Sequence, residues 1–325
     1  TVTKHYTPNQ TVLLNKANFG ITDTNNIIKL TPQWAQDIIE IKLNDNDGTG
    51  GQGSIFARYD TGWYATRADA EEGLPAKKIS ALTDIPTRTG YVFEGYWSNS
   101  SKEELSAFAR RILTVQYIGK DGKFIESAMT EKATAFTNND TIYAHWSPIE
   151  YKIKFDKNTA DAGTAPSSIS AEYDAFVDMP AMPTDFAKQG YTFAGWNTSA
   201  EGDGTNFEAG KTTVVAPNLT STQGEEVTLY AKWVANPYRI AFDKSTATEG
   251  EAPDTIGAVY DQDVDIPAKP DDMNKTGYSF VEWNTAEDGS GTSFAAGETA
   301  KTPNLTPDKD GLVTLFAIWK ANEYK

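Results

Sequence analysis

Apolar and polar residues alternate along short stretches of the chain, and these stretches return at intervals. The alternation is clearest at residues 39–43, 151–155 and 238–242, and a second extended stretch follows each one, at 55–60, 169–174 and 256–261. An apolar residue at every second position indicates a strand with one buried face. The pattern therefore predicts a mainly β protein of the α+β class, built from recurring pairs of strands.

Two aromatic phrases follow the paired strands and set the period of the chain. Gly-Tyr-Thr-Phe-Ala-Gly-Trp at 190–196 returns as Gly-Tyr-Ser-Phe-Val-Glu-Trp at 277–283, 87 positions later, and in altered form at 90–96. A closing phrase follows at 141–146, 228–233 and 314–319. A fixed period of this size is typical of a tandem array. The aromatic positions that we expect in each core are Tyr91, Phe93, Tyr96, Trp146, Tyr191, Phe193, Trp196, Trp233, Tyr278, Phe280, Trp283 and Trp319.

The period divides the chain into about three and a half units. Residues 1–36 match the back half of a unit, and 37–147 form a unit with insertions at 61–80 and 98–125. Two regular units follow at 148–234 and 235–320, and 321–325 match the start of a further strand. About four residues separate one unit from the next, which is short for a linker. Neighbouring repeats are therefore expected to be restricted in orientation and to be each other's partners.

The third strand of a regular unit raises a question of side-chain direction. Tyr191, Phe193 and Gly195 share one face by alternation, so Trp196 falls on the other face unless a bulge intervenes. The glycine-rich stretch at 197–207 predicts a tight turn that a phenylalanine packs down. In the connector at 179–188, part of the segment is expected to form one helical turn.

The insertions interrupt the repeat at 37–147 and carry the candidate binding residues. Ser101, with Glu104 three positions on, forms a capping-box pattern that predicts a helix over 101–113, and a hairpin is expected at 115–125. Insertions in repeat proteins tend to gather on a binding face. One hypothesis is an aromatic platform for a sugar ring with hydrogen-bonding partners beside it, made by Trp63, Tyr64, Arg67, Asp69 and Trp97. The alternative is that Trp63 and Tyr64 enlarge the core.

Composition narrows the classes of partner and compartment. The chain holds 45 acidic and 29 basic residues, a net charge of −16, and no cysteine. This charge excludes nucleic acid and anionic lipid as expected partners, because both require a basic surface. No apolar run is long enough to span a membrane, so membrane insertion is not expected. Since the chain begins at Thr1 and stops inside a repeat, we interpret it as an excerpt whose targeting segments lie elsewhere.

Catalytic and metal chemistry find little support in the residue pattern. Of the two histidines, His145 is matched by Lys232 and Ile318 in the other repeats, so no imidazole is required there. No catalytic residue and no cofactor is therefore expected. Asp45 and Asp47 precede a glycine and offer a weak calcium candidate, against an ordinary turn between strands.

Taken together, these phrases resemble the Listeria–Bacteroides repeat family, which includes the B repeats of internalin-type bacterial surface proteins. The matching features are the opening strand at 151–156, Pro183, the phrase at 190–196, the Gly-x-Gly-Thr-x-Phe turn and the closing phrase at 229–233. The resemblance covers 149–319 closely and 37–146 with insertions. It implies an elongated tandem array of small β-grasp-like modules.

The same resemblance implies a place and a role. Its members belong to secreted or cell-wall-anchored proteins, mostly of Gram-positive and anaerobic bacteria, and serve as spacers or adhesive repeats. The expected function is thus a non-enzymatic stalk or adhesive array on the cell surface. The alternative is a carbohydrate- or host-ligand-binding module, for a host glycan or surface protein, with specificity in the inserted loops at 61–113.

Overall fold

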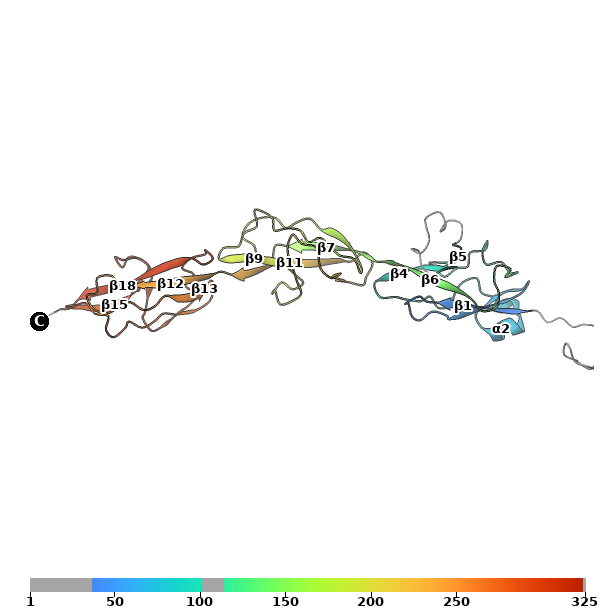
Figure 1. Ribbon diagram of the computed structural model, residues 1–325, viewed down its shortest axis with the longest axis horizontal. Coiled ribbons are helices and arrows are strands. Elements are labelled where there is room, and N and C mark those ends of the chain that lie inside the picture. Colours follow the sequence, from blue (N-terminus) through green and yellow to red (C-terminus); the bar gives the residue numbers. More distant parts are fainter. Residues whose placement is uncertain (1–36, 101–113, 324–325) are drawn as a thin grey trace, which may run out of the picture. The chain divides into compact units, whose positions relative to one another are not determined.

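The computed structural model describes residues 37–100 and 114–323, and this part of the chain is almost entirely β (Figure 1). The expected mainly β class is confirmed. The predicted half repeat at 1–36, the predicted helix at 101–113 and the last two residues of the predicted further strand lie outside the described residues. The described residues fall into two compact units. The first holds those up to Asn46 with Gly50–Ile85 and Gly95–Ala144, and the second holds Asp47–Thr49, Pro86–Glu94 and the residues from His145 onward.

The second sheet shows the regular repeat. Its strands are β7 (Glu150–Asp156), β8 (Ile169–Glu172), β9 (Tyr191–Asn197), β10 (Asn206–Phe207) and β11 (Glu226–Ala235). They lie in the order β10-β9-β11-β7-β8, with β7 and β11 parallel in the centre and antiparallel strands on both sides. A parallel pair requires a crossover, which the chain makes through β8 and β9. The first and the last long strand of the repeat therefore lie side by side in the middle of the sheet.

The third sheet repeats the second strand for strand. It consists of β12 (Pro237–Asp243), β13 (Ile256–Val259), β15 (Tyr278–Asn284), β16 (Ser293–Phe294) and β18 (Leu312–Ala321), in the order β13-β12-β18-β15-β16. A separate small pair joins β14 (Val264–Asp265) to β17 (Thr299–Ala300). Because the sequence repeats with a fixed period, the same alternation builds the same sheet twice.

The first sheet has the same centre and an extended edge. Its strands are β1 (Ile38–Asn44), β2 (Ser54–Arg58), β3 (Gly62–Tyr64), β4 (Tyr91–Trp97), β5 (Gln116–Gly119) and β6 (Asp140–Pro148), in the order β3-β2-β1-β6-β4-β5. The first insertion supplies β3, the short helix α2 (Arg67–Glu72) and the 3₁₀ turn η1 (Pro75–Lys77). The hairpin expected at 115–125 is present, because Ile118 bridges Phe124.

A bulge in β9 decides where the tryptophan of the aromatic phrase points. Ala231 pairs with Trp196 and Trp233 pairs with Phe193, so Lys232 lies opposite both Ala194 and Gly195. Gly195 has φ +120°, a conformation that favours glycine. The bulge turns Trp196 into the core beside Phe193, with 5.2 Å between the ring centroids. The bulge that the sequence analysis required for Trp196 to share a face with Phe193 is therefore present.

Each regular repeat has its own core of aromatic and aliphatic side chains. In the second sheet Trp196 is fully buried against Phe155 and Phe186, and in the third Trp283 is fully buried against Phe242. Such aromatic contacts add to the stabilisation that apolar burial provides. The second core comprises Tyr151, Ile153, Phe155, Ala160, Ala171, Val177, Met179, Phe186, Trp196, Leu229 and Ala231.

One local prediction is wrong. The connector at 179–188 contains no helical turn, and its backbone instead makes a tight turn in which the Phe186 N–H donates to the Pro183 carbonyl at 3.1 Å. Phe186 is thereby placed in the core, stacked 5.8 Å from Trp233.

Candidate functional site

The first insertion buries the aromatic residues that the platform hypothesis required on the surface. Trp63 is 4% exposed and Tyr64 is fully buried. The Trp63 indole N–H donates to the Met129 carbonyl at 3.2 Å, and its ring meets Phe124 and Phe136 edge-on. The structure thus corrects the expectation of an exposed platform, because these aromatics are packed within the first unit. The burial of Trp63 and Tyr64 agrees with the alternative, in which these residues enlarge the core.

Trp97 lies at the end of β4 and is half-buried. It pairs with Gln116 of β5 after a shift in register, so the second insertion covers this end of the strand. The three aromatic residues proposed for the platform are therefore not exposed together.

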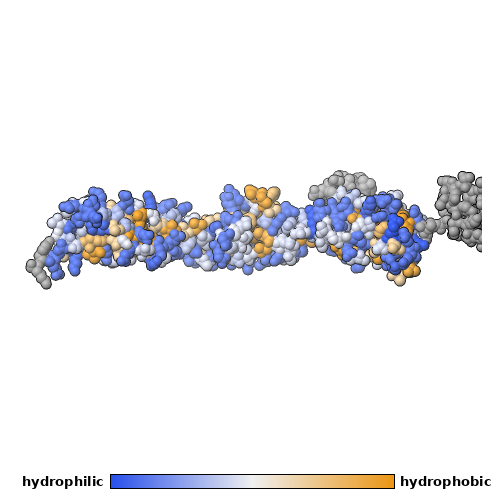
Figure 2. Space-filling model, turned by 90° about the horizontal axis from the view of Figure 1, so that it is seen from below, coloured by the Kyte–Doolittle hydropathy of each residue, from blue (hydrophilic) through white to orange (hydrophobic). Residues whose placement is uncertain are grey.

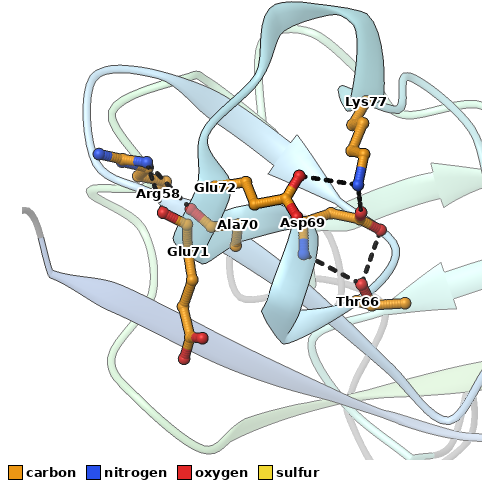
Figure 3. Close-up of polar contacts among 7 residues, drawn as sticks. All are labelled: Arg58, Thr66, Asp69, Ala70, Glu71, Glu72 and Lys77. Carbon is orange, nitrogen blue, oxygen red and sulfur yellow. Dashed lines mark hydrogen bonds and ion pairs between the residues drawn. The ribbon is translucent and has the colours of Figure 1, made fainter.

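Arg67 and Asp69 remain at the surface, on helix α2, and both already have protein partners. Thr66 caps the helix, accepting from the Asp69 N–H at 3.2 Å and donating its hydroxyl to the Asp69 carboxylate at 2.6 Å (Figure 3). The Lys77 ammonium lies 2.7 Å from Asp69 and 2.8 Å from Glu72. Hydrogen bonds from Lys77 and Thr66 lower the pKa of Asp69, and the two carboxylates raise the pKa of Lys77. This group of charges ties α2 to the following turn.

Arg67 takes part in a second, looser set of contacts. Its guanidinium lies 3.7 Å from the Glu40 carboxylate and 5.6 Å from the centroid of the Phe56 ring. Surface ion pairs of this kind contribute little to stability. Ligand binding by Arg67 and Asp69 stays a prediction, since the structure contains these contacts and no ligand.

Arg58 holds the other end of helix α2. Its guanidinium donates to the carbonyls of Ala70 and Glu71 at 3.3 and 3.0 Å, which are among the acceptors that a helix end leaves unpaired (Figure 3). Gly73 ends the helix with φ +66°, and a β-carbon there would lie 1.8 Å from the Arg58 guanidinium. The insertion is therefore fastened at both ends of its helix by side chains of this chain.

The weak calcium candidate is a turn between strands. Asp45 accepts from the Gly51 N–H at 3.1 Å and from the Tyr96 hydroxyl, while Asp47 lies 3.8 Å from Arg88. Across residues 37–100 and 114–323, no three side chains of histidine, aspartate or glutamate come together in a way that could hold a metal ion. His145, which the sequence did not assign to a site, is buried.

A pair of buried asparagines organises the glycine-rich turns, and the sequence analysis did not single them out. Asn197 is fully buried, and its amide oxygen accepts from the N–H groups of Ser199 and Gly204 at 2.9 and 3.1 Å. Its amide nitrogen donates to the carbonyls of Gly202 and Gly204. Asn284 makes the same four contacts in the third sheet. The signal was available, because an asparagine follows the tryptophan in both phrases.

A tyrosine–aspartate contact recurs where one repeat follows another, and both copies lie inside the second compact unit. The Tyr191 hydroxyl donates to Asp261 at 2.8 Å, and the Tyr260 ring meets the Tyr191 ring edge-on with centroids 6.0 Å apart. The aromatic phrase of one repeat thus contacts the turn that follows the second strand of the next repeat. We call Tyr191 with Tyr260 and Asp261 the junction contact.

The earlier copy of the junction contact has the same geometry. The Tyr91 hydroxyl donates to Asp174 at 2.7 Å, and the Tyr91 and Tyr173 rings lie edge-on with centroids 5.8 Å apart. A cation lies over the ring in both copies, with Arg88 4.0 Å from Tyr91 and Lys188 4.2 Å from Tyr191.

Glycine is required on the near side of this contact. Gly190 has φ +77°, and a β-carbon on it would lie 2.3 Å from the Tyr260 ring. Gly90 has φ +76° and would meet Tyr173 at 2.4 Å. The glycine of the repeated phrase therefore lets the aromatic ring of the next repeat lie directly on the backbone.

The aspartate is held on its other side by an asparagine of its own repeat. Asn304 donates to the Asp261 carboxylate at 2.6 Å and accepts from the Asp261 N–H at 2.7 Å. Asn218 does the same for Asp174. These hydrogen bonds, from the asparagine first and the tyrosine second, lower the pKa of Asp261. The Asp261 carboxylate in turn raises the pKa of Tyr191.

The backbone continues the same connection. The Asn236 N–H donates to the Gly190 carbonyl at 2.8 Å, and the Tyr260 N–H donates to the Asn236 carbonyl at 3.0 Å. The Asn236 side chain also donates to the Pro307 carbonyl at 2.8 Å. The sequence analysis identified the two phrases as strands but did not predict that they meet.

Comparison with known proteins agrees with this repeated architecture. The family model of the Listeria–Bacteroides repeat domain matches residues 151–232 and 238–313. Internalin H of Listeria monocytogenes is 27% identical over 221 residues, which are 63% of this chain and 35% of that protein. Across the described residues, no helix combines the length and the apolar character that crossing a membrane demands.

Two proteins of Evansella cellulosilytica are also similar. One, provisionally named a membrane protein, is 33% identical over 280 residues, which are 84% of this chain and 35% of that protein. The other, provisionally named a Gly-rich membrane protein, is 33% identical over 187 residues, which are 58% of this chain and 19% of that protein. The chain thus spans about a third or less of the length of these relatives.

Proposed function

Residues 151–232 and 238–313 belong to the Listeria–Bacteroides repeat family, and on that premise we propose that this region is a non-enzymatic spacer in a bacterial cell-surface protein. Its similarity to Internalin H and to two proteins provisionally named as membrane proteins supports a place at the bacterial surface. In this proposal the region is extracellular, and the consecutive repeats separate whatever lies at its two ends. A spacer serves this purpose only if successive repeats keep a restricted orientation.

The observation that carries the proposal is the junction contact. A hydrogen bond to a carboxylate, an edge-on pair of rings and two backbone hydrogen bonds connect one repeat to the next, and the side-chain part occurs twice. Charge-assisted hydrogen bonds are the stronger kind. Repeats that moved independently of each other would not need the same aspartate, asparagine and glycine at each junction.

Distance measurements between spin labels test the restriction. The chain has no cysteine, so single cysteines can be introduced at exposed Asp203 and Glu287, one in each regular repeat. We expect a narrow distance distribution in the parent protein and a broader one with Tyr191→Phe, which removes one hydroxyl. Tyr278→Phe is the matched control, because Tyr278 takes no part in the contact that Tyr191 makes with Tyr260 and Asp261. A broad distribution in the parent would contradict a semi-rigid spacer.

An exposed apolar patch supports adhesion as a second candidate. Phe176, Val214 and Val215 are 65%, 92% and 70% exposed, and the Val177 and Thr213 backbones bond to each other beside them. Apolar surface gathers over the second sheet on the face drawn in Figure 2. Exposed apolar patches often mark interaction sites. In this reading the repeats attach to a host surface protein, and Phe176→Asp should lower retention of the protein on cultured epithelial cells.

The inserted loops at 61–113 provide the remaining candidate, recognition of a host glycan. Arg67 is exposed and Asp69 is half-buried, whereas Trp63 and Tyr64 are buried. A glycan array probed with the parent and with Arg67→Ala tests it. Binding that depends on Arg67 would favour a ligand-binding module over a plain spacer.

A further inference from the structure

We propose that Lys275, Gly277 and Tyr278 form a docking surface for the Tyr–Asp turn of a further Listeria–Bacteroides repeat placed after Glu323. The inference rests on the spacer function proposed above and names the partner that one end of the array binds. Two surfaces, each with a glycine, a tyrosine and a cation over its ring, are occupied by such a turn, and this third surface is assembled in the same way.

The backbone half of the junction is already present in the third sheet. The Asn322 N–H donates to the Gly277 carbonyl at 2.9 Å, as Asn236 does to Gly190 at 2.8 Å. The Ser279 hydroxyl donates to the Asn322 side chain at 2.6 Å, in the place where Thr192 contacts Asn236. The chain therefore leaves the third sheet along the path that leads from the second sheet into the third.

The side-chain half presents the same groups. The Lys275 ammonium lies 3.8 Å from the centroid of Tyr278 and donates to the Thr246 hydroxyl at 2.7 Å. Lys188 has the same two partners, lying 4.2 Å from Tyr191 and 3.0 Å from the Thr159 hydroxyl. A threonine thus holds the lysine over the ring in both repeats.

Tyr278 differs from Tyr91 and Tyr191 in how much of it is exposed and in what its hydroxyl contacts. Tyr278 is 40% exposed, whereas Tyr91 and Tyr191 are half-buried. Within the described part of the chain, the Tyr278 hydroxyl meets no acceptor comparable to Asp174 or Asp261. Gly277 has φ +81°, close to the value at Gly90 and Gly190, where a tyrosine ring lies on the glycine.

The surface specifies the chemistry of its occupant. It needs a ring that lies flat on a glycine and, directly after it in sequence, a carboxylate that accepts from the Tyr278 hydroxyl. Both known occupants supply this with an aspartate at φ +58°, at the end of a strand. Left-handed aspartate in such turns is tolerated because its short side chain bonds locally. The positive charge of Lys275 favours the aspartate further.

An extended chain tests the proposal. The full chain to Glu323 is followed by a second copy of residues 238–320, which reproduces the spacing from Asn236 to Tyr238. Spin labels are placed at Glu287→Cys and at the matching glutamate of the appended copy. We expect a narrow distance distribution, which Tyr278→Phe broadens as much as Tyr191→Phe broadens the earlier junction. Replacing the appended copy's equivalent of Asp261 by asparagine should have the same effect, and both changes together should add nothing.

The outcomes separate this inference from the proposed function. If Tyr278→Phe leaves the new distribution unchanged while Tyr191→Phe still broadens the earlier one, the docking surface is refuted and the spacer stands. If neither substitution broadens its distribution, the junction contact does not restrict the repeats and both proposals fall. If the chain without the appended copy self-associates with rising concentration and Tyr278→Phe abolishes this, a second copy is the occupant and the proposal as stated is wrong.

Discussion

The strand that carries the aromatic phrase is β4 in the first sheet and β9 in the second, and the two strands end in different residues. In β9, Trp196 is followed by the buried Asn197, and the indole N–H of Trp196 donates to the Pro180 carbonyl at 3.0 Å. In β4 the corresponding residues are Tyr96 and Trp97, and the Tyr96 hydroxyl donates to Asp45 instead. Burial and the bond to Asp45 raise the pKa of Tyr96. The first repeat therefore lacks the buried tryptophan and asparagine that the regular repeats have at these positions.

The first insertion of the first repeat supplies a buried tryptophan, Trp63, which the aromatic phrase of that repeat lacks. Trp63 is buried, packs edge-on against two phenylalanines and donates its indole N–H to a backbone carbonyl, as Trp196 does in the second sheet. The comparison teaches that an irregular segment in a repeat need not signal a binding site. Here its largest side chains lie in the core, and its charged side chains fasten the short helix that follows them.

Removing Trp63 should produce the largest effect. We expect Trp63→Ala to destabilise the first unit by about 3–5 kcal/mol, because a large buried aromatic is lost and a cavity remains. Trp196→Ala is the matched change, with a loss of similar size confined to the second unit. Hydrogen exchange followed by mass spectrometry assigns each loss to its unit. A decrease below about 1 kcal/mol for Trp63→Ala would contradict its role as a core residue.

Removing Asn197 should be the next most damaging change. We expect Asn197→Ala to lower the free energy of unfolding by about 2–3 kcal/mol, because buried N–H and carbonyl groups of the glycine-rich turn lose their partners. Asn206→Ala is the control, since Asn206 is exposed and its side chain makes a single long contact at 3.4 Å. Urea denaturation measures both. Equal effects of the two substitutions would show that the buried asparagine does not organise the turn.

The alternation of apolar residues was sufficient to predict the strands of the regular repeats. In β7, Tyr151, Ile153 and Phe155 are buried and the residues between them are exposed, as a half-buried strand requires. Periodicity could not say that Tyr191 reaches Asp261, because a side-chain contact between residues 70 positions apart leaves no periodic trace. Nor could it say whether Trp63 is exposed, because an aromatic residue in an insertion is compatible with a core and with a platform.

A pair of glycine substitutions, one at the end of helix α2 and one in the second unit, tests whether Arg58 holds the helix. We expect Gly73→Ala to destabilise the first unit by about 2 kcal/mol, because alanine is strained at positive φ and displaces the Arg58 guanidinium. Gly224→Ala is the control in the second unit, since Gly224 has φ +75° and no atom within 4 Å of the added carbon. The control should lose only the strain, about 1 kcal/mol. Equal losses, measured by thermal unfolding, would mean that Arg58 does not hold the helix.

Acid should weaken the first and the third repeat for different reasons. This is the smallest effect expected. In the first repeat a bond from Lys77 lowers the pKa of Asp69 below its ordinary value of 3.8, whereas in the third repeat bonds from Ser290 lower the pKa of Asp288. A lowered pKa means that the contribution of each carboxylate to stability is present above its unfolded pKa and is lost as the pH falls through its folded pKa. NMR of the carboxyl carbons follows both titrations.

Salt distinguishes the two causes. Added salt screens an exposed charge pair, so the pKa of Asp69 should rise toward 3.8 as salt is added, while the pKa of Asp288 should move less because its partner is neutral. Lys77→Met should raise the pKa of Asp69 and make it insensitive to salt, leaving Asp288 unchanged. If Asp69 keeps its lowered pKa in Lys77→Met, the Thr66 hydroxyl alone would account for it, and Lys77 would not be what ties the inserted helix to the turn that follows.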